Sequence, residues 1–295
     1  MFIDSFIGYL KAEKHYSAHT LRAYEGDVRS FKEFVSRIDE SLLFWEVDID
    51  VVRSWVASMM DAGASPTSVG RRLSALRTFF TFLRKERVVS DSPAASFKGP
   101  KCGKPLPVFV RVEEMDRLID ETEFGCGYAA CRDRMILQLF YETGVRLSEL
   151  VELDVSSVDM QACNIKVLGK RNRERVIPFA RGLWQALDFY LAQRAAFAPD
   201  APPALFLSDK GCRVSRSYIY RMVNTRLADV TTLKKRSPHV LRHTFATSML
   251  NNDAEIGAVK ELLGHSRLAT TEVYTHLTFE DLKCFYEKAH PRAGE

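Results

Sequence analysis

The sequence predicts a mainly α-helical protein of two domains: an N-terminal helical bundle and a C-terminal α+β domain with a small antiparallel sheet. Three observations support this fold class. Apolar residues recur at helical spacing through most of the 295 residues. The segment SDSPAASFKGPKCGKPLP, rich in proline and glycine, interrupts that spacing near residues 98–107. Two short apolar runs flank GKRNRE in the second half, which is typical of a β-hairpin.

The first domain is expected to contain helices only. A short helix is predicted over residues 2–10, and longer ones over 21–38 and 51–59. A fourth helix is predicted over 65–83, since serine at 65 suits the N-cap and the proline that follows suits the first helical position. The face opposite its apolar stripe is basic, and we expect part of it to contact DNA phosphates, namely Arg71, Arg72 and Arg77.

The second domain is expected to be mixed. We place the helical domain at 1–98, the linker at 99–107 and the second domain at 108–295. Helices are predicted at roughly 112–121, 129–143, 147–152, 180–197, 214–228, 239–250, 254–263, 269–275 and 279–288. Strand-like runs lie at 164–168, 175–179 and 205–207.

The composition is that of an ordinary globular protein, with 46% apolar and 27% charged residues. No run of 18 apolar residues occurs, so no transmembrane helix is expected. The N-terminus places an acid before its apolar residues and lysines after them, the reverse of a signal peptide, so we expect a cytoplasmic protein. The six cysteines form no CxxC pair, which favours free thiols over disulfides or a metal site.

Positive charge is concentrated locally, although the net charge is only +4. Five basic residues crowd the segment 166–175 against a single acid, Glu174, and three more follow one another at 234–236. Any one such run is commonly just a solvated surface. Two runs beside other candidate phosphate ligands favour a nucleic-acid partner.

Four local motifs in the second domain carry residues that can handle a phosphate. TGVRLSEL places Arg146 at a helix start, a position that favours anions, and the hairpin turn carries Lys170. In PHVLRHTFATSML, His239 and Arg242 share a helix face. His239 and His243 have the spacing of a zinc pair, but the glutamate of HExxH is missing, so no metal is expected.

The fourth motif, LLGHSRLATTEVYTH, adds His265 and Tyr274. Each of these residues alone is ordinarily a surface or packing residue. Together they are complete for phosphodiester cleavage without a metal or other cofactor. Tyr274 would be the nucleophile, two arginines would clamp the phosphate, Lys170 would protonate the leaving 5′ oxygen, and the histidines would transfer protons or hydrogen-bond the phosphate.

The order and content of these motifs resemble the tyrosine recombinases, and within them the Xer proteins, over nearly the whole chain. The resemblance implies a catalytic set of Arg146, Lys170, His239, Arg242, His265 and Tyr274. One departure lies in the hairpin, where the family commonly has GKGxKER and this chain has GKRNRER. Arg171 and Arg173 replace a glycine and a lysine there, and both are candidate DNA ligands.

The resemblance also implies how the protein works with partners. It implies a clamp around a duplex recombination site, a 3′-phosphotyrosyl intermediate, and a tetramer formed with itself or with a second Xer recombinase. It further implies a C-terminal helix over 279–290 that docks into a neighbouring protomer, and activation by the septal DNA translocase FtsK. An integrase of a mobile element, a type IB topoisomerase and a DNA-binding protein without catalysis are the alternatives. No arm-binding domain precedes the helices, as it often does in phage integrases, which favours the Xer role.

Overall fold

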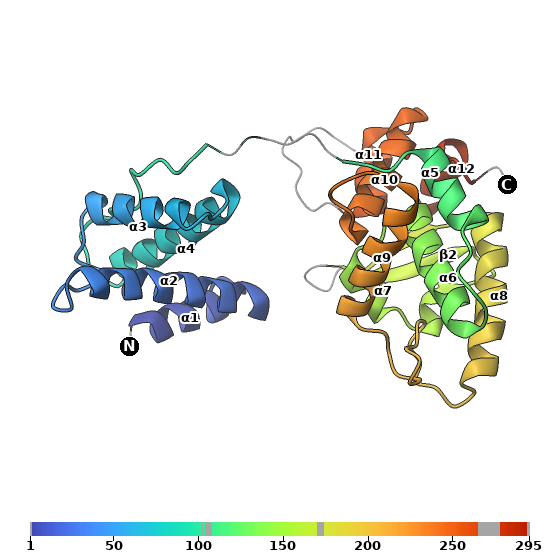
Figure 1. The fold of residues 1–295 in the computed structure, drawn as a ribbon, viewed down its shortest axis with the longest axis horizontal. Coiled ribbons are helices and arrows are strands. Elements are labelled where there is room, and N and C mark those ends of the chain that lie inside the picture. The colour runs from blue at the N-terminus through green and yellow to red at the C-terminus, as the bar shows by residue number, and fades with distance from the viewer. Residues whose placement is uncertain (1, 102, 104–107, 170–173, 265–277, 294–295) are drawn as a thin grey trace. The chain divides into compact units, whose positions relative to one another are not determined.

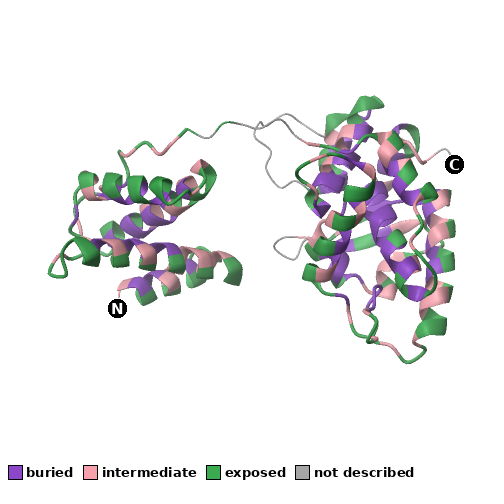
Figure 2. Cartoon of the chain, in the orientation of Figure 1, coloured by how far each residue is buried: buried purple, intermediate pink, exposed green. Residues whose placement is uncertain are grey.

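The computed structural model describes residues 2–101, 103, 108–169, 174–264 and 278–293. The chain divides into two compact units, Met1–Pro105 and Leu106–Glu295, which Figure 1 draws in blue to green and in green to red. Each unit has a hydrophobic cluster of its own. Figure 2 shows the buried residues lining the inner faces of the helices in both units.

Unit 1 is the helical bundle that the apolar spacing predicts. Side-chain oxygens of Ser17, Asp48 and Ser65 accept backbone N–H groups at the starts of its last three helices, which explains where these begin. The apolar residues between 69 and 83 are buried against the helix at 18–38. Its elements are α1 (Phe2–Ala12), α2 (Ala18–Ile38), α3 (Ile49–Asp61) and α4 (Pro66–Lys85).

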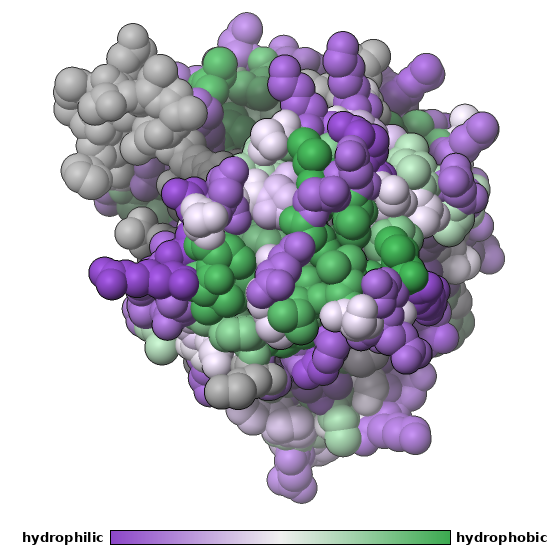
Figure 3. Space-filling model, turned by 90° about the vertical axis from the view of Figure 1, so that its left-hand side faces the viewer, coloured by the Kyte–Doolittle hydropathy of each residue, from purple (hydrophilic) through white to green (hydrophobic). Residues whose placement is uncertain are grey.

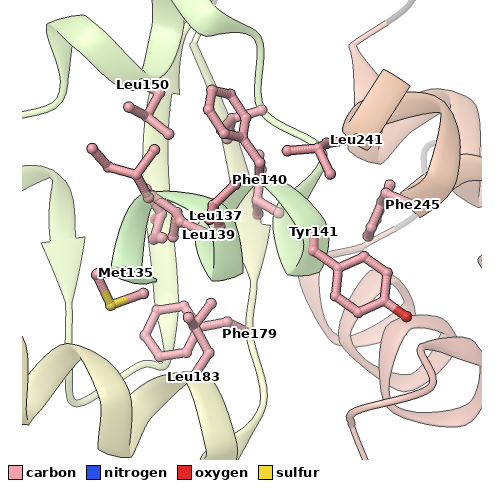
Figure 4. Close-up of a cluster of buried hydrophobic side chains, with 14 of the residues drawn as sticks. Met135, Leu137, Leu139, Phe140, Tyr141, Leu150, Phe179, Leu183, Leu241 and Phe245 are labelled. Carbon is pink, nitrogen blue, oxygen red and sulfur yellow. The ribbon is translucent and has the colours of Figure 1, made fainter. Parts of the chain in front are cut away.

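Unit 2 is built around one central helix, α6 (Tyr128–Thr143), which is buried over nearly its whole length. It packs against α8 (Arg181–Phe197) and α10 (Pro238–Asn251). Figure 4 shows its side chains among those of Leu150, Phe179, Leu183, Leu241 and Phe245. The other helical elements are α5 (Val112–Asp116), η1 (Arg117–Glu121), α7 (Leu147–Glu152), η2 (Val155–Ser157), α9 (Arg216–Val230), α11 (Ile256–Leu263) and α12 (Phe279–Ala289).

The sheet of unit 2 is small and antiparallel, as predicted, with the order β1-β2-β3. The strands are β1 (Val158–Asp159), β2 (Asn164–Leu168) and β3 (Glu174–Pro178). Val167 pairs with Arg175 and Ile165 with Ile177. Since Ile165, Val167 and Ile177 are buried, Arg175 lies on the inner face of the sheet.

One predicted strand is wrong. Residues 205–207 form no strand, and their surroundings contain only the isolated bridges Asp154↔Ala204 and Leu207↔Arg213. The run is apolar because Leu205, Phe206 and Leu207 are buried, and burial alone does not imply a ladder. The two-residue strand β1 was not predicted, and the predicted helix at 269–275 lies outside the described residues.

The predicted helix at 112–121 is confirmed, but its second half, η1, has π-helical hydrogen bonds. Among the residues that the structure describes, no helix combines the length and apolar character needed to cross a bilayer. Some large apolar side chains are exposed, among them Ile38, Leu43 and Phe189. Figure 3 shows a hydrophobic area with a hydrophilic border on one face of the molecule.

The C-terminal helix α12 packs on its own unit in this single chain. Leu282, Tyr286 and Ala289 are buried, and α12 contacts β3, α10 and α11. His290 follows the helix and stacks on the ring of Tyr286, and burial lowers the pKa of this histidine to about 4. Docking of 279–290 into a neighbouring protomer therefore stays a prediction, and it would require the neighbour to offer similar apolar cover.

Candidate active site

Three arginines converge where α11 ends in unit 2. Arg146 stands at the N-cap of α7, Arg175 on the inner face of β3, and Arg242 on the second turn of α10. They donate hydrogen bonds to the carbonyls of three consecutive residues, Leu262, Leu263 and Gly264. The last carbonyls of a helix have no partner within the helix and carry its negative dipole end, so they attract cations.

Arg242 is the most deeply buried of the three, with 6% of its surface exposed. Its Nη1 donates to the carbonyl of Gly144 at 2.7 Å and its Nη2 to that of Leu263 at 2.5 Å. Gly144 ends α6 in the left-handed region, with φ of +59°, and a Cβ there would lie 2.6 Å from the ring of Phe245. This glycine therefore lets α6 end close enough to α10 for its carbonyl to bind Arg242.

Arg146 is held by Glu149, three residues further along. The carboxylate accepts the backbone N–H of Arg146 at 2.8 Å and its Nη1 at 2.6 Å, while Nη2 reaches Gly264 at 2.9 Å. Its side chain is 35% exposed, against 3% for that of Glu149. Arg146 is thus fixed on the inside and accessible on the outside, as a residue that receives a phosphate must be.

Arg175 was not among the predicted site residues. Its Nη1 and Nη2 each donate to one oxygen of Glu149 at 2.8 Å, and its Nε donates to Leu262 at 2.9 Å. In the sequence it belongs to the basic run 166–175, which favours a nucleic-acid partner but does not distinguish this residue from its basic neighbours. The signal that could have singled it out is the alternation with Ile177, which puts residue 175 on the buried side of the strand.

The charges of this cluster are strongly coupled. Burial opposes ionisation of Glu149, but hydrogen bonds from Arg175 and Arg146 outweigh it and lower the pKa of this carboxyl to about 2. Burial, followed by the positive charges of Arg146 and Arg175, lowers the pKa of Arg242 to about 9. Burial is the larger cause of the lowered pKa, and the excess of positive charge follows from the groups present, three guanidinium groups and one carboxylate, which an anion would relieve.

Glu149→Gln is expected to lower the stability of the protein by roughly 3 kcal/mol at pH 7, from the fall of the carboxyl pKa from 4.5 to about 2. The lowered pKa means that the ionised carboxyl stabilises the fold above pH 4.5 and that this contribution is lost as the pH falls toward 2. The difference between wild type and variant should therefore shrink on acidification. Urea denaturation at a series of pH values measures it, and a difference independent of pH would contradict the ionised pair.

His239 lies at the predicted place, the start of α10, one turn before Arg242, and it is exposed. Its Nε2 is 3.0 Å from Nε2 of His243, so one ring donates a hydrogen bond to the other. Burial, with the charges of Arg242 and Lys235, lowers the pKa of His243. Among the described residues, no group of three or more His, Cys, Asp or Glu could hold a metal ion.

Lys170, His265 and Tyr274 lie outside the described residues, and so do the candidate DNA ligands Arg171 and Arg173. The structure thus brings together Arg146 and Arg242 and places His239 on the helix of the latter. Gly264, whose carbonyl binds Arg146, is the residue directly before His265 in the sequence.

The candidate DNA ligands of α4 all have partners inside unit 1. Arg71 forms an ion pair with Asp27, and Nε of Arg72 lies 3.9 Å from the same carboxylate. Arg77 donates to the carbonyls of Ala94 and Phe97 at 2.9 and 2.6 Å, which ties the segment after α4 to the bundle. Arg71 and Arg72 keep 47% and 35% of their side-chain surface exposed, and contact with DNA stays a prediction for all three.

Two family models match the chain. The model of the phage integrase family matches residues 109–281, and the phage integrase N-terminal SAM-like domain matches residues 3–87. The first match includes the arginine cluster, and the second covers the four helices of unit 1.

Curated relatives match over nearly the full length. A tyrosine recombinase XerC of Pelotomaculum thermopropionicum is 37% identical, covering 99% of this chain and 98% of that protein. A tyrosine recombinase XerC of Vibrio vulnificus is 38% identical, with 99% and 91% covered, and one of Mycobacterium tuberculosis is 37% identical, with 99% of both covered.

Solved structures share the fold at lower identity. The XerH site-specific recombinase bound to its difH substrate, in a pre-cleavage complex, has a TM-score of 0.70 at 22% identity, with 95% of this chain and 83% of that chain covered. The Tn1549 transposon integrase in complex with transposon right end DNA has a TM-score of 0.73 at 18% identity, with 97% and 98% covered.

Proposed function

The chain belongs to the phage integrase family and is a tyrosine recombinase, a site-specific DNA recombinase; from this premise we propose that it resolves chromosome dimers as an Xer recombinase. Unit 1 would clamp one side of a duplex recombination site, and unit 2 would supply the chemistry. The proposal assigns the core-binding domain to 1–98, the linker to 99–107 and the catalytic domain to 108–295.

The proposed reaction begins with Tyr274. Its hydroxyl oxygen attacks the scissile phosphorus, the bond from phosphorus to the 5′ oxygen breaks, and a 3′-phosphotyrosyl bond forms. Lys170 gives a proton to the leaving 5′ oxygen, and a histidine, His239 or His265, takes up the proton of the tyrosine. The 5′ hydroxyl of the partner strand then attacks the phosphorus of the 3′-phosphotyrosyl link. A new phosphodiester bond forms, the bond to the Tyr274 oxygen breaks, and the tyrosine takes back a proton, so no ATP is required.

The observation that carries this proposal is the joint anchoring of Arg146 and Arg242. The two guanidinium groups bind adjacent carbonyls, those of Gly264 and Leu263, and the pKa of Arg242 is lowered by burial and by its positive neighbours. Rigid donors in a site with excess positive charge suit a phosphate whose negative charge grows in the transition state.

The Xer role is supported by relatives named XerC at 35–38% identity over nearly the whole chain. On this proposal the protein works in the cytoplasm as a tetramer on two DNA sites, with itself or with a second Xer recombinase. The exchange of the segment 279–290 between protomers and activation by the translocase FtsK belong to the same proposal. An integrase of a mobile element would use the same chemistry on different DNA.

Mapping covalent protein–DNA adducts across the host genome tests the role. We expect one locus near the replication terminus with the wild-type protein and none with Tyr274→Phe. Adducts at the ends of a mobile element would replace the Xer role by an integrase role. Relaxation of supercoiled DNA without a defined site would point to a topoisomerase.

A further inference from the structure

Glu149 creates a conflict inside the arginine cluster. It fixes Arg146 through both the backbone N–H and the side chain, and it is 3% exposed. A buried carboxylate 2.6 Å from the guanidinium of Arg146 would also cancel the charge that this arginine presents to a phosphate. Arg146 would therefore bind a phosphate poorly unless a second cation balanced the charge of Glu149.

Arg175 supplies that cation. It binds both oxygens of Glu149 side by side, the geometry in which arginine and carboxylate interact most strongly, and it is 13% exposed. Its third nitrogen, Nε, is bonded to Leu262. Each of the three nitrogens therefore has an intramolecular acceptor, and Arg175 is placed to hold the cluster and not to contact a substrate.

The net charge of the cluster shows what this pairing does. Three guanidinium groups and one carboxylate leave a net charge of +2, and Arg175 with Glu149 forms an internally neutral pair. We propose that Arg175 is a positioning residue that neutralises Glu149, so that the full charges of Arg146 and Arg242 act on the phosphodiester. The inference rests on the proposed function and assigns to this residue a part in phosphate recognition.

The competing explanation is a purely mechanical one, in which Arg175 only ties β3 to the end of α11. Gly264 packs closely on its side chain, since a Cβ on this glycine would lie 3.1 Å from Cδ of Arg175. A mechanical role and a charge-balancing role differ in one respect. Balance matters only while Glu149 is charged, whereas a mechanical link matters whether it is charged or not.

The test is a double-mutant cycle of Arg175→Gln and Glu149→Gln, with the rate of covalent adduct formation on a duplex target measured in a single turnover. Arg175→Gln alone should slow the reaction about 30-fold or more, as truncation of one partner of a buried charge pair does. In the Glu149→Gln background, Arg175→Gln should change the rate by less than about threefold, because no negative charge is left to balance. Equal slowing in both backgrounds, or no slowing in either, would overturn the proposal.

Arg213→Gln is the matched control. Arg213 also binds a carboxylate, that of Asp154, and helix-end carbonyls, those of Val151 and Leu153, but it does not contact Glu149. The Arg213→Gln variant should leave the rate of adduct formation unchanged. Thermal melts of all variants test whether they are folded at the assay temperature.

A second readout separates this inference from the proposed function. If the wild-type protein forms no adduct on any DNA, the proposed function fails, and the binding of inorganic phosphate is followed instead. The rise in melting temperature with phosphate, at matched ionic strength, should be smaller for Arg175→Gln than for the wild type and should be restored in the double variant. The same rise in all three proteins would reject the charge balance.

Discussion

Tyr274→Phe is expected to abolish covalent attachment to DNA while leaving binding of the duplex intact. The substitution removes only the hydroxyl group, whose oxygen is the proposed nucleophile, and phenylalanine keeps the aromatic ring. The loss should exceed about 10⁴-fold, since no other route to the adduct remains. Denaturing gels measure the covalent adduct, and electrophoretic mobility shifts measure binding of the same duplex.

The mapped position of the adduct is the control for this experiment. Peptides from the wild-type adduct should carry the nucleotide on Tyr274. Attachment at another residue, or an adduct that persists in Tyr274→Phe, would reject the nucleophile.

Arg242→Met is expected to slow cleavage by about 10² to 10³-fold, the range for loss of one preorganised donor in an active site. The substitution should change the free energy of unfolding little, because two effects of opposite sign nearly cancel. The fall from 12.5 to about 9 means that protonated Arg242 destabilises the folded state by about 5 kcal/mol at pH 7, and this penalty disappears in the variant. Loss of two charge-assisted hydrogen bonds, to Gly144 and Leu263, costs about 3 to 6 kcal/mol in the opposite direction.

Arg194→Met provides the comparison. Arg194 likewise donates to two carbonyls, those of Ala204 and Pro202, at 3.0 and 2.6 Å, but it belongs to α8 and has no part in the cluster. It should keep the full cleavage rate. A normal rate in Arg242→Met would show that this arginine does not bind the scissile phosphate, and unfolding of that variant would show that its hydrogen bonds outweigh its charge penalty.

Periodicity predicted the helices well because each signal is local. The predicted bounds of α7 and β2 agree with the structure, and Ser65 caps the helix that it was predicted to begin. The run at 205–207 was taken for a strand because apolar character reports burial, whereas a strand also requires a neighbour in register. The tight strand β1 has two residues and carries no detectable pattern.

The site could be predicted only as far as local motifs reach. Arg146 and Arg242 were identified from the segments around them, and in the structure they bind adjacent carbonyls, while their catalytic role stays a prediction. The pairing of Arg175 with Glu149 joins residues 26 positions apart, and Gly264, whose carbonyl binds Arg146, lies 118 positions from that arginine. Such distances leave no periodic trace in the chain, so the partner of a charged residue in a basic run had to come from the structure.

The turn at Leu262–Gly264 has a consequence for how the protein is made. Each of the three arginines donates a hydrogen bond to a carbonyl of this turn, and the turn follows all three of them in the chain. A chain still on the ribosome, or one cut before residue 262, lacks the acceptors that hold the guanidinium groups in place. Fragments that end before residue 262 are therefore expected to contain the arginines without the arrangement that the whole chain gives them.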